Sequence, residues 1–175
     1  RAPSVPNHGL RSGINMGWSF SNARASIRAI SNERGRTIRT SLSLTHPAFG
    51  SDFYQVTFRY RWTEYISMPW RHHHVLALSL GGGISAGNLR RNSFYLGGYP
   101  EQDYINALID MSWLGGNYLR GYPPGVIGGM QYHMLNAEYR FPIWNPEVGI
   151  VTLPVFLSHI WFAVFCDVGG AFAQD

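Results

Sequence analysis

The sequence predicts an all-β fold, an antiparallel transmembrane β-barrel of which this chain supplies about six or seven strands. Three observations lead to this prediction. Apolar and polar residues alternate with a period of two over several stretches, as in strands with two different faces. Aromatic residues and glycine are abundant (10 Tyr, 10 Phe, 6 Trp and 20 Gly), whereas only 14% of the residues are charged. No apolar run is long enough for a transmembrane helix, so a membrane crossing would have to use strands.

The charge pattern argues against nucleic-acid binding. The formal net charge is +4, and all 14 positive charges are arginines that are spread along the expected strands instead of lining one helix. The one cysteine, Cys166, excludes an internal disulfide, and we interpret it as a small packing residue within a strand.

The first half of the chain is expected to form four strands, because four alternating stretches are separated by polar or proline-containing turns. They are expected at 13–21, 36–45, 53–66 and 73–86. The third has an aromatic apolar face, which favours a lipid-facing strand over a soluble sheet, since membrane strands carry aromatic girdles at both interfaces. The fourth has small residues on its other face, which leave room for material inside the barrel: Ala77, Ser79, Gly81, Gly83 and Ser85.

The second half begins with 42 residues, 88–129, that break the alternation and are expected to form a long functional loop. Within this loop, residues 101–113 fit a short amphipathic helix or a coil packed by its aromatics. Strands are expected again at 130–143 and 159–169, the second ending at Gly169-Gly170, and they are joined by a proline-punctuated connection that is partly strand.

Three adjacent histidines, His72, His73 and His74, raise the question of a metal site. Successive residues of a strand point to opposite sides, so three neighbours cannot bind one metal ion together. We therefore expect no metal here and interpret these histidines as interfacial or turn residues.

One arginine and two carboxylates form the candidate site. Arg120 lies in the long loop among glycines, prolines and aromatics, and Glu138 and Asp167 fall by parity on the inward face of the next two strands. A guanidinium inside a barrel needs a carboxylate partner, and its planar fork can bind a carboxylate through two hydrogen bonds. We expect Asp167 to be the main partner of Arg120, because Gly169 beside it leaves space for an incoming loop.

Four short motifs follow one another along the second half of the chain. They are Phe94-Tyr95-Leu96-Gly97-Gly98, Leu119-Arg120-Gly121-Tyr122, Glu138-Tyr139-Arg140-Phe141-Pro142 and Phe165-Cys166-Asp167-Val168-Gly169. Together they resemble the F-x-LGG segment, the (V/L)RG(F/Y) loop tip, and the E-x-R-F-P and F-x-D-x-G strands of BamA-like and two-partner-secretion (TpsB) barrels, the bacterial surface antigen superfamily.

The resemblance implies a sixteen-stranded outer-membrane barrel that follows periplasmic POTRA domains. Residues 1–175 would then be part of one barrel domain with the long loop 88–129, and the POTRA domains and closing strands would lie outside this chain. Other chain segments or subunits would complete the barrel.

For the site, the resemblance implies that Arg120, Gly121 and Tyr122 anchor the loop in the lumen, and that Glu138 and Asp167, with Gly169, receive the anchor. It also implies an integral protein of the bacterial outer membrane that inserts or translocates proteins without a cofactor, and we expect no activity as an enzyme. Its partners would be outer-membrane lipid and client β-barrel or secreted proteins, not nucleic acid.

Three other functions stay open at this point. A passive pore or structural barrel would use Arg39, Arg59 and Arg61 in its lumen to favour anionic solutes. An enzyme could use Glu138 and Asp167 as a catalytic pair, although no nucleophile, metal set or phosphate loop accompanies them. A soluble β-sandwich that binds a partner would bury the apolar faces in a core.

Overall fold

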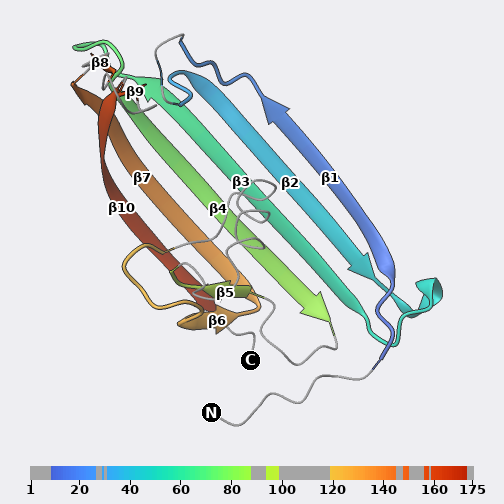
Figure 1. Ribbon diagram of the computed structural model, residues 1–175. Helices are drawn as coiled ribbons and strands as arrows, with labels where there is room; N and C mark the ends of the chain where they lie inside the picture. Colours follow the sequence, from blue (N-terminus) through green and yellow to red (C-terminus); the bar gives the residue numbers. More distant parts are fainter. Residues whose placement is uncertain are drawn as a thin grey trace.

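The computed structural model describes residues 9–26, 29, 31–87, 94–98, 119–144, 148–149, 156–157 and 159–172. Its main element is an antiparallel six-stranded sheet in the order β1-β2-β3-β4-β7-β10 (Figure 1). The strands are β1 (Gly13–Ser21), β2 (Gly35–Thr45), β3 (Gln55–Ser67), β4 (Val75–Gly87), β7 (Gln131–Trp144) and β10 (Ile160–Phe172). A short 3-10 helix, Pro47–Phe49, joins β2 to β3, and no helix among the described residues could span a membrane.

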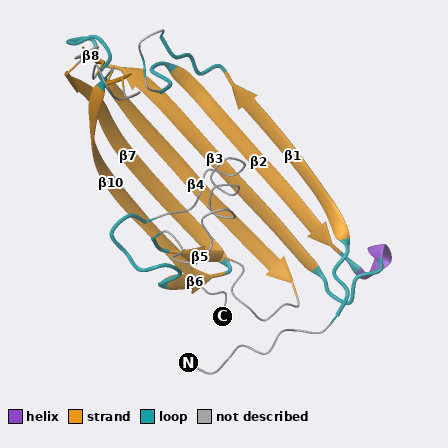
Figure 2. Ribbon diagram, viewed as in Figure 1, coloured by secondary structure: helices purple, strands orange, loops and turns teal. Residues whose placement is uncertain are grey.

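Two small sheets accompany the large one (Figure 2). The first pairs β5 (Phe94–Leu96) with β6 (Ile127–Gly129), and the second pairs β8 (Val148–Gly149) with β9 (Phe156–Leu157). The predicted connection after residue 144 is therefore part strand, as expected. The predicted loop 88–129 contains regular structure, because its two described arms, β5 and β6, pair with each other. The helix considered for 101–113 lies outside the described residues.

The six long strands confirm the all-β, antiparallel prediction, and three details differ from it. β10 does not end at Gly169-Gly170 but continues to Phe172, because both glycines keep their ladder partners, Met134 and His133. β4 begins at Val75, so the three histidines lie in the turn before it and not in a strand. Cys166 is exposed on the sheet instead of packed in a core.

The register separates the sheet into two faces of opposite character. One row across all six strands is polar: Ser21, Thr37, Thr63, Ser79, Asn136 and Asp167. The next row along the strands is apolar: Phe20, Ile38, Trp62, Leu80, Leu135 and Val168. Within the polar row, hydroxyl groups lie 3.1 Å apart in the pairs Ser21–Thr37 and Thr63–Ser79.

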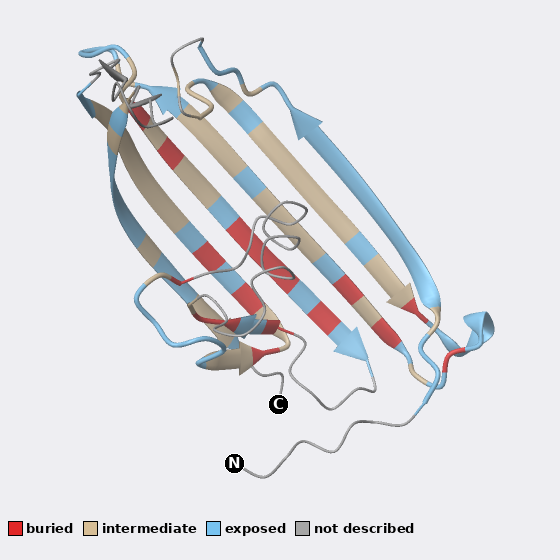
Figure 3. Ribbon diagram, in the orientation of Figure 1, coloured by how far each residue is buried: buried red, intermediate tan, exposed pale blue. Residues whose placement is uncertain are grey.

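The apolar face, called the outward face below, is open to the surroundings. Large apolar side chains on it are at least one third exposed on every strand: Ile14, Met16, Trp18, Phe20, Leu42, Phe58, Trp62, Ile66, Leu80, Ile84, Leu135, Phe162, Val164, Val168 and Phe172. A soluble domain would bury such a face, whereas a lipid bilayer solvates it. β1 is exposed along its whole length (Figure 3).

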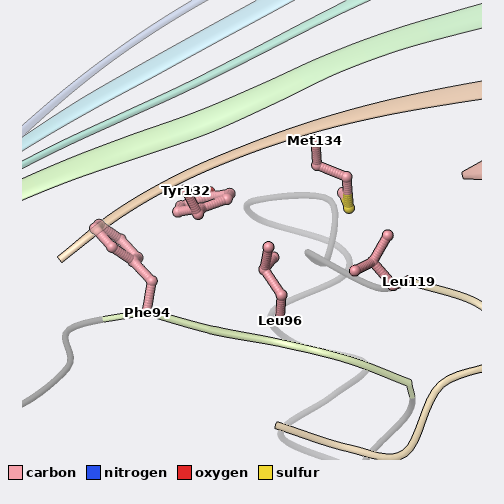
Figure 4. Close-up of a cluster of buried hydrophobic side chains, with 5 residues drawn as sticks. All are labelled: Phe94, Leu96, Leu119, Tyr132 and Met134. Carbon is pink, nitrogen blue, oxygen red and sulfur yellow. The ribbon is translucent and has the colours of Figure 1, made fainter. Parts of the chain in front are cut away.

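The polar face, called the inward face below, carries β5 and β6 near one end of the sheet (Figure 1). A buried cluster joins them to β7, with Phe94 and Leu96 facing Tyr132 and Met134, and Leu119 beside Met134 (Figure 4). Gly83 of β4 makes room for this cluster, since a Cβ there would lie 2.6 Å from Tyr132 and 2.8 Å from Phe94. Gly83, one of the small inward residues of β4 predicted from the sequence, thus leaves room for β5 on this face.

Candidate functional site

Arg120 follows Leu119 at the point where the loop returns to the sheet. The backbone N–H of Leu119 donates to the carbonyl of Gly97 at 2.8 Å, and the Leu119 side chain is only 2% exposed. The arms approach closely at Gly97, where a Cβ would lie 2.3 Å from the carbonyl oxygen of Pro123. After Arg120 the chain turns at Gly121, whose φ of 88° is a conformation that favours glycine. These contacts fix the direction in which the arginine projects.

Asp167 of β10 receives most of the hydrogen bonds from Arg120. The guanidinium donates from Nε to Oδ2 and from Nη2 to Oδ1, each at 2.7 Å, and the backbone N–H of Arg120 donates to Oδ2 at 3.1 Å. The Asp167 side chain is only 3% exposed. A paired fork with an additional backbone bond fixes both the position and the orientation of the arginine.

Glu138 of β7 binds the remaining side of the guanidinium. Arg120 Nη1 donates to Glu138 Oε2 at 2.9 Å, and Arg140 Nε donates to Glu138 Oε1 at 2.5 Å. Asn136 Nδ2 donates to Asp167 Oδ1 at 2.8 Å. All four carboxylate oxygens therefore accept hydrogen bonds from a cation, an amide or both, which favours the ionised form of each carboxylate.

The ring of Phe165 completes the site, with the Arg120 guanidinium carbon 3.7 Å from its centroid. Such a contact adds a cation–π attraction to the ion pairs. The pKa of the Arg120 guanidinium is raised above its usual value, mainly by its side-chain hydrogen bonds to Asp167. Burial acts in the opposite direction, and the hydrogen bond to Glu138 adds to the increase. Arg120 is thus a permanent cation.

The structure brings Arg120, Glu138 and Asp167 together, and Asp167 is the partner with more bonds, as expected. Gly169 lies beside them, and a Cβ there would be 3.3 Å from Leu119, so its small size admits the loop. Tyr122, also expected to anchor the loop, is 56% exposed.

Sequence reasoning assigned no role to Phe165, Asn136 or Arg140. Asn136 and Arg140 lie two residues from Glu138, and Phe165 lies two residues before Asp167, so alternation places all three on the face of the carboxylates. That spacing was the available signal. The contact of Arg140 Nη1 with Ser31 Oγ, at 2.9 Å, had no signal in the sequence.

The histidine turn makes its own contacts. His73 Nδ1 lies 2.7 Å from Glu33 Oε1, and His74 Nδ1 lies 2.8 Å from the hydroxyl of Tyr139. Burial, and then the nearby charge of Arg71, lower the pKa of His74. Among the residues that the structure describes, no group of three or more His, Cys, Asp or Glu side chains could hold a metal ion.

Comparison with known proteins assigns the chain to a family. The Omp85 superfamily domain matches residues 4–175, which include the sheet, both described arms of the loop and the site. A search among curated proteins finds no match.

Proposed function

The chain belongs to the Omp85 superfamily, and we propose on that premise that it is a barrel segment of an integral outer-membrane protein that assembles or translocates other proteins. In this proposal the loop between β4 and β7 is held inside the lumen by Arg120. The observation that carries it is the three-fold attachment of Arg120 to Asp167, through two guanidinium nitrogens and the backbone N–H.

The attachment suits a role in holding a loop. A loop that crosses a water-filled lumen loses conformational freedom, so it stays in place only if its contacts offset that loss. Burial of Leu119 and the ionic contacts of Arg120 supply such contacts on one short segment. The partly exposed ion pair with Glu138 leaves the attachment accessible to water, so that it can be released.

We propose that this role is not enzymatic. A carboxylate that works as a general acid must hold a proton near neutral pH, and both carboxylates here are held ionised by guanidinium groups. The partners in this proposal are outer-membrane lipid on the outward face and client β-barrel or secreted proteins, which are the general partners of the superfamily.

A passive pore is the second candidate, because one observation favours it. Arg39, Arg59 and Arg61 lie on the inward face of β2 and β3, opposite Ser19, Gly83 and Gly81 in the adjacent strands. Positive charges along a lumen attract anions. In this alternative the loop would set the pore diameter and no client protein would be handled.

The two functions are separated by measuring client folding and ion conductance on the same vesicles. The intact protein and its Asp167→Asn variant would be reconstituted, with Glu64→Gln, a carboxylate of the outward face, as the control. An assembly or translocation factor should speed up client insertion, and D167N should reduce that rate while E64Q leaves it unchanged. A wild-type protein that conducts anions but gives no acceleration of any client would support the pore instead.

A further inference from the structure

The connection between β1 and β2 lies at the end of the sheet away from β5 and β6 (Figure 1). It starts as a continuation of the hairpin, with the backbone N–H of Arg24 donating to the carbonyl of Arg34 at 2.8 Å. Ser31, in the returning part, is 2.9 Å from Arg140 of β7.

This contact is long-range within the sheet, because β3 and β4 stand between β2 and β7. Neighbouring strands are about 4.8 Å apart, so Ser31 and the long Arg140 side chain together bridge roughly three strand spacings. Arg140 has the parity of Glu138 and lies on the inward face, so the connection reaches over the lumen side of the sheet. A second contact supports this course, since His73 of the β3–β4 turn is 2.7 Å from Glu33.

Arg140 uses two different nitrogens for its two partners. Nη1 donates to Ser31 Oγ, and Nε donates to Glu138 Oε1. The second oxygen of Glu138 accepts from Arg120. An unbroken series of hydrogen bonds therefore runs from the loop tip, through Glu138 and Arg140, to the β1–β2 connection.

We propose that Arg140 is a positioning residue that couples the two segments covering the inward face. With Arg120 in place, Glu138 is held so that its other oxygen binds Arg140, and Arg140 in turn holds Ser31. When the loop tip leaves, Glu138 is free to turn toward Arg140 and draw its guanidinium away from Ser31, which loosens the connection at the far end. This inference rests on the proposed function, because it makes the anchored loop one partner of the coupling.

The chemistry explains why arginine is needed at position 140. Only a planar fork can offer two fixed donors to partners on two different segments, whereas the single ammonium of lysine would favour the carboxylate. Arg140→Lys should therefore retain the contact with Glu138 and lose the contact with Ser31. Because Arg140→Lys keeps the positive charge, an effect of this variant would show that the coupling needs the guanidinium and not only a positive charge.

The test uses the intact protein in lipid vesicles and trypsin as the probe, since residues 24–34 contain three arginines. Cleavage within this segment would be measured by mass spectrometry for Arg120→Ala, Ser31→Ala and Arg140→Lys. Arg36→Ala is the control, because Arg36 pairs with Glu64 on the outward face. We expect R140K and S31A to increase cleavage roughly tenfold, the factor for one lost hydrogen bond to a charged group. We expect R120A to increase it in the same direction, and R36A to leave it unchanged.

The decisive comparison is the double mutant R120A/S31A, because Arg120 and Ser31 are not in contact. Coupling through Arg140 predicts that the two changes are non-additive, and that they become additive when Arg140 is lysine. Additive effects with Arg140 present would overturn the coupling. The anchor itself is tested separately by hydrogen exchange of residues 119–129 in Asp167→Ala, so a failure of the proposed function is distinguished from a failure of the coupling.

Discussion

The two faces of one sheet each hold an arginine against a carboxylate, under very different conditions. On the inward face, Arg120 makes a paired fork and a backbone bond to an Asp167 side chain that is 3% exposed. On the outward face, Arg36 Nη2 lies 3.3 Å from Glu64, and their side chains are 48% and 28% exposed. The same pair of chemical groups is a multiply bonded junction in one place and a single ionic contact in the other.

The difference shows where ion pairs contribute to this fold. In an exposed pair, screening by water and the loss of side-chain entropy offset most of the Coulomb attraction, so the pair stabilises the fold little. A shielded carboxylate with several donors stabilises its partner segment, and the loss of one member leaves the other charge without compensation. The inward pair joins segments 47 residues apart, whereas the outward pair lies within adjacent strands that backbone bonds already hold.

The largest effect is expected for Asp167→Ala. It removes the partner of two guanidinium nitrogens and one backbone N–H, and leaves Arg120 its hydrogen bond to Glu138 and its contact with the Phe165 ring. We expect loop docking to weaken by about 3 kcal/mol, the lower end for a buried pair because Arg120 is 26% exposed. Hydrogen exchange of residues 119–129 should become faster, while the amides of β3 and β4 stay protected by their ladder. Unchanged hydrogen exchange in the loop would contradict the claim that the Arg120–Asp167 pair holds it in place.

A second prediction compares the two faces directly at neighbouring positions of β4. Leu80→Arg places a charge on the outward face, which costs about 2–4 kcal/mol if that position is at the middle of a bilayer. Ser79→Arg places the same charge on the inward face and should cost far less. The folding yield of each variant in vesicles would be measured from its heat-modifiable band on a gel. Equal yields for the two variants would mean that the outward face does not meet lipid.

A third prediction concerns two glycines on the inward face. Gly83→Ala would place a Cβ 2.6 Å from Tyr132, whereas the nearest atom to a Cβ at Gly81 is Arg61 Nη2 at 3.6 Å. We expect Gly83→Ala to weaken the packing of β5 by about 1–3 kcal/mol, as overpacking does, and Gly81→Ala to have little effect. Protease cleavage after the β5 strand would report the difference. Both variants replace glycine by alanine in the same strand, so a difference between them cannot come from β-strand propensity.

The smallest effect is expected for Arg36→Ala. Because its pair with Glu64 is exposed, unfolding in denaturant should shift by no more than about 1 kcal/mol. A shift as large as that of Asp167→Ala would show that exposure does not separate the two pairs.

Alternation was sufficient to predict both faces of the long strands. It placed Asn136, Glu138 and Asp167 on one side before any neighbour was known, and β10 lies beside β7 in the sheet as expected for consecutive antiparallel strands. The pairing of Arg120 with Asp167 follows once a long loop must return to that side. Strand ends were less predictable, because glycine reads as a turn in the sequence but pairs in the ladder at Gly169 and Gly170.

Contacts that depend on the path of the chain were not predictable. β5 and β6 have three residues each, too few to show a period. Ser31 meets Arg140 although β3 and β4 lie between β2 and β7 in the sheet, and no local pattern encodes that contact. Parity identifies which residues share a face but not which distant segment reaches them.

The most direct test of the inward junction is a double-mutant cycle on Arg120 and Asp167 in the intact protein. Hydrogen exchange of residues 121–129 would be measured for Arg120→Ala, Asp167→Ala and the double variant. Because each single change removes the same set of bonds, the double variant should exchange little faster than either one. If the two effects simply add, Arg120 and Asp167 act independently, and the loop is held by something other than this pair.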